Sequence, residues 1–180
     1  AEGRFYTTIS YLDGNEAWHD LELIVLDDYA ANEVNLIRPF SGAWPPPEKQ
    51  ILLERNSLNL TGKEIGDTLL IETSTGTQRA LPIAGLTHDM NQAPAQITGI
   101  PYGYVTLDTL EWLGMPRSFN RLHFIVAEEP DNKAHIQNVG QAIADKVERN
   151  GSFVFWSEIP NPGEHFVQEF LPTIVAIFGI

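Results

Sequence analysis

The sequence predicts an α+β fold, with strands and helices in separate runs along one chain of 180 residues. Two segments near the start alternate apolar and polar residues as half-buried strands do, whereas Asp131–Asn150 repeats its apolar residues at helical spacing. Hydrophobic residues make up 43% of the chain, which is enough for a buried core and excludes a disordered chain.

The first third predicts a hairpin followed by a proline-rich corner. Arg4–Leu12 is rich in β-branched and aromatic residues and predicts a strand. A turn at residues 13–15 leads to a second strand at Leu21–Val25. Tyr29–Ile37 has weak helical spacing, and Pro45–Pro47 predicts a stiff extended spacer.

The middle third predicts a helix and then a second hairpin. Glu48–Leu60 carries apolar residues at helical spacing, and Gly62 ends this helix. Gly66 lies in a turn before Asp67, where we expect a positive φ. The elements that follow are strands at Thr68–Glu72 and Gln78–Leu86 and a polar loop at Thr87–Pro101.

The last third predicts a short helix and a strand–helix–strand unit. The short helix spans Thr106–Leu113, with Thr106 as its N-cap. The unit Leu122–Trp156 has the length expected of a βαβ motif. Its parts are a strand at Arg121–Ala127, a helix at Asp131–Asn150 ended by Gly151, and a strand at Ser152–Ile159.

The net charge of −13 limits the classes of partner. An acidic surface repels phosphate backbones and anionic lipid headgroups, so we expect no nucleic-acid binding and no attraction to such lipids. The chain has no cysteine, which excludes disulfides and thiolate metal sites.

No pattern of residues predicts catalysis, a bound metal or a cofactor. The five histidines are spread singly, and no serine stands in a nucleophile-elbow motif. His88 and Asp89 form the nearest approach to a polar pair, and we interpret them as a solvated loop pair. The sequence therefore predicts no catalytic, cofactor-binding or metal-binding residue.

Aromatic residues near loops and prolines are the candidate partner contacts. They are Trp44, Tyr102, Tyr104 and Trp112. Packing in the core is the alternative for each of them, and both interpretations stay open.

The uncharged segment Phe170–Ile180 has two interpretations. It is either a core element at the end of the chain or the first turns of a transmembrane helix, because polar residues stop sharply before it. Eleven residues are too few to span a bilayer, which takes about 20.

Several short motifs occur in an order that resembles a known family. They are the corner Gly42, Trp44, Pro45, then EKQILLERNSL (Glu48–Leu58), IGDTLLIE (Ile65–Glu72), LPIAGLTHD (Leu81–Asp89), YGYVTLDTLEWLG (Tyr102–Gly114), FNRLHFIVAEE (Phe119–Glu129) and VERNG (Val147–Gly151). In this order they resemble the large extracytoplasmic domain of ABC-transporter permeases of the MacB-like, FtsX-related type.

The resemblance implies a particular domain organisation. A porter-like mixed α/β layer is formed by both chain ends, residues 1–47 and 117–180, and a second α+β subdomain is inserted at 48–116. Ala1–Arg4 resembles a point just after the first strand–helix unit of the domain, which implies that one edge element is missing. Membrane helices of the parent protein flank the domain, on the extracytoplasmic face of the bacterial inner or cell membrane.

The resemblance also implies the partners. A cytoplasmic ABC ATPase acts through the membrane helices of the parent, and the full transporter is compatible with a homodimer. A cargo or extracytoplasmic partner contacts the domain, and no catalytic residue is carried over. A soluble ligand- or protein-binding α+β module is the alternative function.

Overall fold

The computed structural model describes residues 1–159 and divides the chain into two compact units, which begin at Ala1 and Ile125. Eight strands and four helices lie in the described residues, so the predicted α+β class is confirmed. The strands are β1 (Glu2–Leu12), β2 (Trp18–Leu26), β3 (Ile37–Gly42), β4 (Ile51–Glu54), β5 (Thr68–Glu72), β6 (Gln78–Asp89), β7 (Tyr102–Thr106) and β8 (Arg121–His123). The helices are α1 (Leu58–Thr61), α2 (Ala95–Thr98), α3 (Leu107–Trp112) and α4 (Lys133–Arg149).

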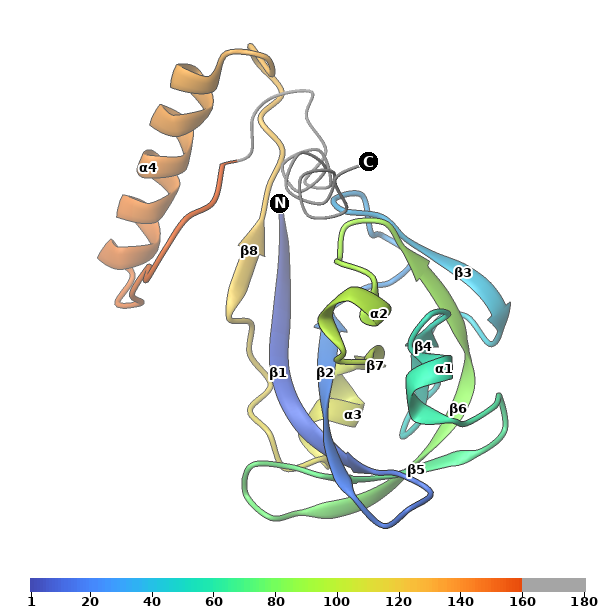
Figure 1. Ribbon diagram of the computed structural model, residues 1–180. Coiled ribbons are helices and arrows are strands. Elements are labelled where there is room, and N and C mark those ends of the chain that lie inside the picture. Colours follow the sequence, from blue (N-terminus) through green and yellow to red (C-terminus); the bar gives the residue numbers. More distant parts are fainter. Residues whose placement is uncertain (160–180) are drawn as a thin grey trace, which may run out of the picture. The chain divides into compact units, whose positions relative to one another are not determined.

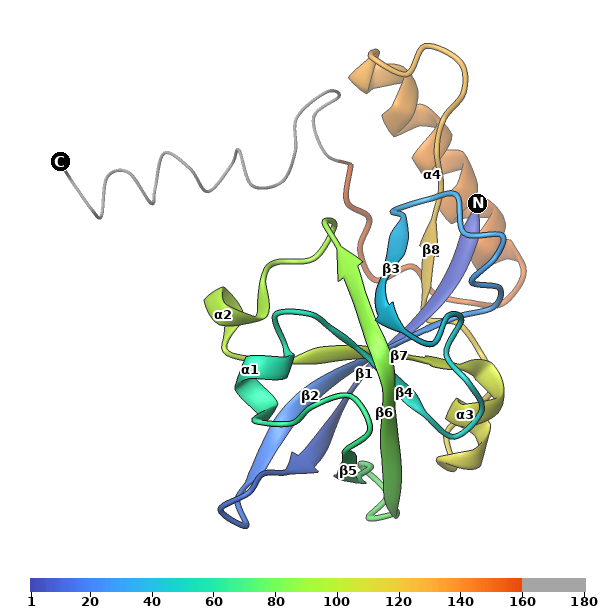
Figure 2. The ribbon, with the colours of Figure 1, turned by 90° about the vertical axis from the view of Figure 1, so that its right-hand side faces the viewer.

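Six strands of the first unit form a closed ring (Figures 1 and 2). The order is β2–β7–β4–β6–β5–β1, and β1 pairs back with β2 through the predicted hairpin. The closing contact between β1 and β5 is short, with Ser10 opposite Glu72 and Tyr11 opposite Ile71. β3 pairs with β6 and β8 pairs with β1, both outside the ring.

The inside of the ring is the main hydrophobic core. Each ring strand contributes alternate side chains to it, because successive residues of a strand point to opposite faces. Helix α3 contributes to the same core through Leu107 and Leu110. Residues of this core are Ile9, Tyr11, Leu21, Leu23, Val25, Ile51, Leu53, Leu69, Ile71, Leu81, Ile83 and Val105.

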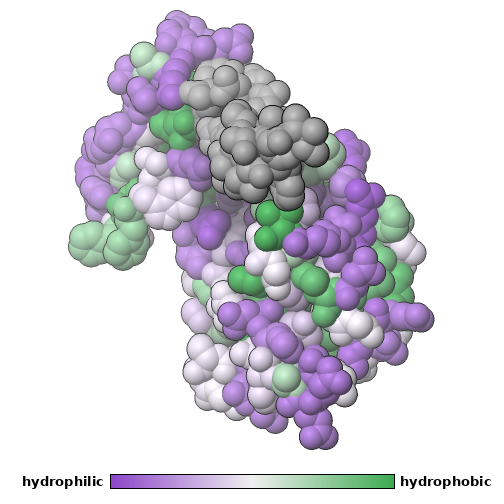
Figure 3. All heavy atoms as spheres, viewed as in Figure 1, coloured by the Kyte–Doolittle hydropathy of each residue, from purple (hydrophilic) through white to green (hydrophobic). Residues whose placement is uncertain are grey.

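A second buried cluster covers the outer face of β1, β2, β4 and β7. It is formed by Tyr6, Ile24, Leu26, Tyr29, Ile37, Leu52, Ala95, Tyr102 and Tyr104. The chain between β2 and β3 and the chain between β6 and β7 supply the covering residues. On the face shown in Figure 3, hydrophilic residues predominate and hydrophobic residues are scattered among them.

A buried arginine ties the β2–β3 connection to β1. Arg4 is fully buried, and its Nη2 donates to the carbonyl oxygens of Val34 and Asn35. The carboxylate of Glu2 lies 3.6 Å from the same guanidinium and accepts from the backbone N–H groups of Glu33 and Val34. This network takes the place of the helix that weak spacing suggested for Tyr29–Ile37, which is irregular up to β3.

The predicted helix Glu48–Leu60 is wrong over most of its length. Ile51–Glu54 is strand β4, which lies parallel to β6 and antiparallel to β7, and only Leu58–Thr61 is helical. All four residues of β4 are buried because one face meets the ring interior and the other meets the outer cluster. A strand buried on both faces shows no alternation, so its sequence cannot be distinguished from a buried helix by periodicity.

The predicted division into two subdomains is corrected by the strand pairing. β5 and β7 come from the predicted insertion at 48–116, yet β5 pairs with β1 and β7 pairs with β2. Backbone hydrogen bonds between two segments make them one sheet, so the boundaries at 47/48 and 116/117 do not separate folded parts. The first compact unit ends at Phe124 instead.

In the described part of the second unit, residues 125–159, the predicted long helix is present, but the predicted βαβ motif is not. Helix α4 spans Lys133–Arg149, and the Asn132 side chain caps it by accepting from the His135 N–H at 3.2 Å. Strand β8 ends at His123, in the first unit, and residues 152–159 form no strand. Phe153 and Phe155 pair with no strand among residues 1–159, and both rings are exposed.

Among residues 1–159, no helix combines the length and apolar character that a bilayer crossing requires. Phe170–Ile180, whose two interpretations the sequence leaves open, lies outside the described residues.

Candidate functional site

Three side chains form a row across the outer face of the ring. Thr8 of β1 is directly opposite Glu22 of β2, and Glu22 is directly opposite Tyr102 of β7. Residues opposite one another on paired strands point to the same face, so this register brings a hydroxyl, a carboxyl and a phenol together. The row continues the outer cluster beyond Tyr6, Ile24 and Tyr104.

The connection between β6 and β7 forms the opposite wall. It includes the short helix α2, whose Ala95 is buried in the outer cluster. Gln92 Nε2 donates to the Tyr6 hydroxyl at 3.1 Å, which fixes the start of this wall to β1. Its end is fixed by Pro101, whose carbonyl accepts from the Glu22 N–H at 2.9 Å.

A pocket of about 200 Å³ lies between the row and this wall. Its lining residues are Thr8, Glu22, Gln92, Ala93, Thr98, Ile100 and Tyr102. Within residues 1–159, neither the Tyr102 hydroxyl nor the Glu22 carboxylate has a hydrogen-bond or ion-pair partner. Tyr102 as a whole is only 3% exposed, but its hydroxyl oxygen is not among the buried side-chain atoms that lack a hydrogen-bond partner, so this oxygen is accessible from the pocket.

The electrostatics of the pocket favour the neutral forms of both groups. Burial raises the pKa of the Glu22 carboxyl, and the positive charge of Arg121 opposes this rise. Burial also raises the pKa of the Tyr102 phenol, and the negative charges of Glu54, Asp89 and Glu22 raise it further. A positive charge in the pocket would relieve both effects.

Asp89 bonds to Tyr104, two residues from Tyr102 on β7, and its burial corrects the interpretation of His88 and Asp89 as a solvated pair. Asp89 is 4% exposed, and its Oδ2 accepts from the Tyr104 hydroxyl at 2.6 Å. Its Oδ1 accepts from the Asn91 N–H at 2.7 Å. The backbone amide of Tyr102, at the start of β7, donates to Ser57 Oγ at 2.9 Å. This bond holds β7 against the residue that precedes helix α1.

The structure separates the four aromatic residues that sequence analysis singled out. Tyr102 and Tyr104 lie side by side with ring centroids 6.2 Å apart, but Tyr104 is fully buried and its side chain is closed to a partner. Trp44 packs edge-on against Tyr29 at 5.6 Å. Trp112 packs on the ring core, with the Arg79 guanidinium 5.4 Å from its ring. Of the four, Tyr102 alone lines the pocket.

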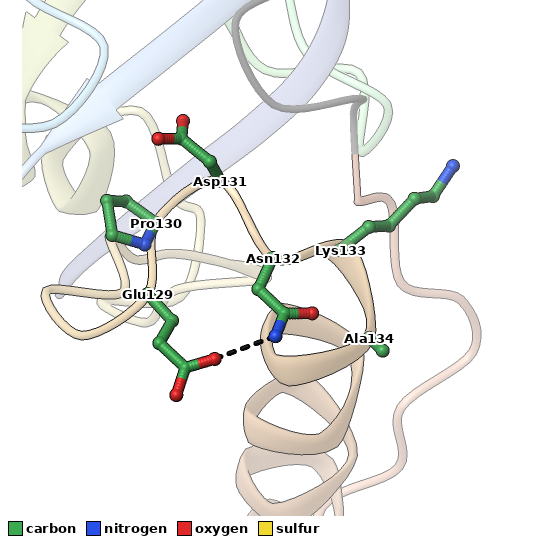
Figure 4. Close-up of a pocket in the computed structure, with 6 residues that line it drawn as sticks. All are labelled: Glu129, Pro130, Asp131, Asn132, Lys133 and Ala134. Carbon is green, nitrogen blue, oxygen red and sulfur yellow. Dashed lines mark hydrogen bonds between the residues drawn. The ribbon is translucent and has the colours of Figure 1, made fainter.

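A second hollow lies in the other unit, at the start of α4 (Figure 4). One continuous run, Glu129–Ala134, lines it, and Glu129 Oε2 accepts from Asn132 Nδ2 at 2.7 Å. The Glu129 carboxylate already accepts from Asn132, the residue that caps α4. We therefore interpret this hollow as part of the helix cap and not as a binding site.

Sequence reasoning missed Thr8, Glu22 and Gln92. The available signal was Glu22 itself, an acidic residue between Leu21 and Leu23 and therefore on the face opposite the core. That signal does not identify Tyr102 or Gln92 as neighbours, because they lie about 70 to 80 residues away in the sequence. Among the described residues, no group of three or more histidine, aspartate or glutamate side chains is arranged to hold a metal ion.

Comparison with known proteins adds no family assignment: no protein-family model and no curated protein sequence matches this chain.

Proposed function

We propose that this chain is a non-catalytic extracytoplasmic domain of an ABC-transporter permease of the MacB-like, FtsX-related type. In this role it contacts a cargo or partner protein and relays motion that is coupled to a cytoplasmic ATPase. The alternative is a ligand- or protein-binding module with no connection to transport.

The arrangement of the family-like motifs carries this proposal. The motifs at Ile65–Glu72 and Leu81–Asp89 form the antiparallel pair β5 and β6 of the ring. The motif at Tyr102–Gly114 forms β7 and α3, and its Tyr104 hydroxyl bonds to Asp89. Segments that resemble one family therefore contact one another in a single folded unit, as expected if they were inherited together.

The pocket supports binding over catalysis. Covalent catalysis needs a nucleophile activated by a base within hydrogen-bond reach, or a nucleophile of lowered pKa. The Tyr102 phenol has no hydrogen-bonded base among the described residues, and its pKa is raised. The Tyr102 hydroxyl and the Glu22 carboxylate are instead suited to hold a charged or polar group that another molecule supplies.

The closed ring suits a part that transmits force. The six ring strands close through backbone hydrogen bonds, and the Arg4 network fixes the β2–β3 connection to β1. A unit without a hinge inside its sheet moves as one body when either end is displaced.

The test is purification of the full-length parent protein from its native membrane in mild detergent. We expect an ABC ATPase to co-purify and to hydrolyse ATP, whereas the 180-residue chain alone hydrolyses none. A parent protein that is purified without any ATPase, at matched yield, would refute the transport role and favour the alternative module.

A further inference from the structure

We propose that the pocket between Glu22, Tyr102 and Gln92 binds a primary alkylammonium group, such as the end of a lysine side chain. This inference rests on the proposed function, because it names the chemistry by which the domain would recognise a cargo or partner.

Two unpartnered groups converge in the pocket. The Tyr102 hydroxyl belongs to a residue that is 3% exposed, and it has no hydrogen bond within residues 1–159. The Glu22 carboxylate also has no partner there, although burial disfavours its charge. Glu22 is half-buried, and the Tyr102 hydroxyl is not among the buried polar atoms that lack a partner, so both groups are open to the pocket and can accept hydrogen bonds from a ligand that enters it.

The neighbouring hydrogen bonds determine what these groups offer. Because Gln92 Nε2 donates to the Tyr6 hydroxyl, the amide Oε1 remains available as an acceptor. Together with the Glu22 carboxylate and the Tyr102 oxygen on the strand side of the pocket, it provides a third acceptor on the opposite wall. An ammonium group has three diverging N–H donors, whereas a guanidinium prefers acceptors in one plane.

Charge and size agree with this ligand. Glu54 and Asp89 add negative charge that acts on Tyr102. The nearby cation Arg121 stacks on the Tyr6 ring at 4.0 Å and forms no ion pair with Glu22 in the described part of the chain. A volume of about 200 Å³ exceeds what one water needs, about 30 Å³, and is below the range of about 300–1,000 Å³ typical of drug-sized ligands. It fits an ammonium group and the carbons next to it, with Ile100 and Ala93 as apolar wall.

The test titrates the 180-residue chain with three probes while its backbone amide NMR signals are recorded. The probes are Nα-acetyl-lysine methylamide, butylamine and the uncharged control Nα-acetyl-norleucine methylamide. We expect the two amines to shift the signals of Thr8, Glu22 and Tyr102 and to bind at least about tenfold more tightly than the control.

Matched variants locate the site. Glu22→Gln should weaken amine binding at least about tenfold, and Tyr102→Phe, which keeps the ring, should weaken it about threefold to tenfold. The control is Asp20→Asn, an exposed carboxylate on the same strand and face but outside the pocket, and it should change binding by less than about twofold. Thermal unfolding of each variant verifies that it is folded.

The probes also identify the source of the ligand. Tighter binding of the lysine derivative supports a lysine of a protein partner, and tighter binding of butylamine supports a free amine. Equal binding of the amines and the norleucine control, or an unchanged amine affinity in Glu22→Gln, would overturn the inference. Failure here leaves ATPase co-purification unaffected, so the two proposals can fail separately.

Discussion

The two faces of β1, β2 and β7 differ in what they do, although the same three strands supply both. The inner face presents apolar side chains to a core that each ring strand completes. The outer face presents a buried arginine, a row of polar side chains and a pocket with two unpartnered groups. The comparison teaches that one strand can contribute to stability through one face and present polar groups for binding on the other, because successive side chains point to opposite faces.

The largest expected effect comes from the inner face. Leu23→Ala removes a fully buried side chain from the middle of the core and should lower the free energy of unfolding by about 3–4 kcal/mol. Denaturant unfolding measures it. The comparison variant is Thr8→Ala on the outer face, which should cost less than about 0.5 kcal/mol because Thr8 is exposed. Similar costs for the two variants would break the distinction between faces.

Arg4 is the outer-face position at which we expect the largest dependence of stability. Arg4→Met leaves the carbonyls of Val34 and Asn35 and the carboxylate of Glu2 without their cation. We expect a loss of about 2–3 kcal/mol, together with faster amide exchange in residues 30–36. A variant as stable as the parent would show that the apolar contacts of the connection hold it in place without Arg4.

Two tyrosines on the same strand sharpen the comparison within the outer face. Tyr104→Phe removes the hydroxyl that donates to Asp89 and should cost about 1–2 kcal/mol. Tyr102→Phe removes a hydroxyl without a partner in the described residues and should change stability by less than about 0.5 kcal/mol. The two unfolding curves, measured side by side, test this. The reverse order would mean that the Tyr102 hydroxyl is structural.

The smallest effect is the pH dependence of Glu22. Its pKa in the folded protein is raised above the ordinary 4.5, so the folded state holds its proton more tightly than the unfolded state does. Well below pH 4.5, the Glu22 carboxyl is protonated in both states and does not lower the free energy of unfolding. As pH rises through its folded pKa, the carboxyl lowers the free energy of unfolding increasingly. Glu22→Gln should remove that cost, so its stability relative to the parent should rise from pH 4 towards neutral. Parallel stability curves across this window would contradict the buried position of the carboxyl.

Local signals explain which elements could be predicted. Strands Arg4–Leu12 and Thr68–Glu72 follow from alternation, and helix α4 follows from its apolar stripe between an asparagine cap and a glycine. Thr106 caps α3 as expected, accepting from the Thr109 N–H at 3.2 Å. Gly66 has the expected positive φ of 98°, and a side chain there would meet open space, so backbone conformation alone favours glycine.

The sequence by itself therefore determined the α+β class, the hairpin strands and the capped helices, because each depends on residues within a few positions of one another. Tertiary structure alone decided that Ile51–Glu54 is a strand, since four buried residues suit a helix or a strand until β6 and β7 flank them. It also decided the pocket: the register across β1, β2 and β7 brings Thr8, Glu22 and Tyr102 together. Strand pairing depends on hydrogen bonds between distant segments, which no local pattern encodes.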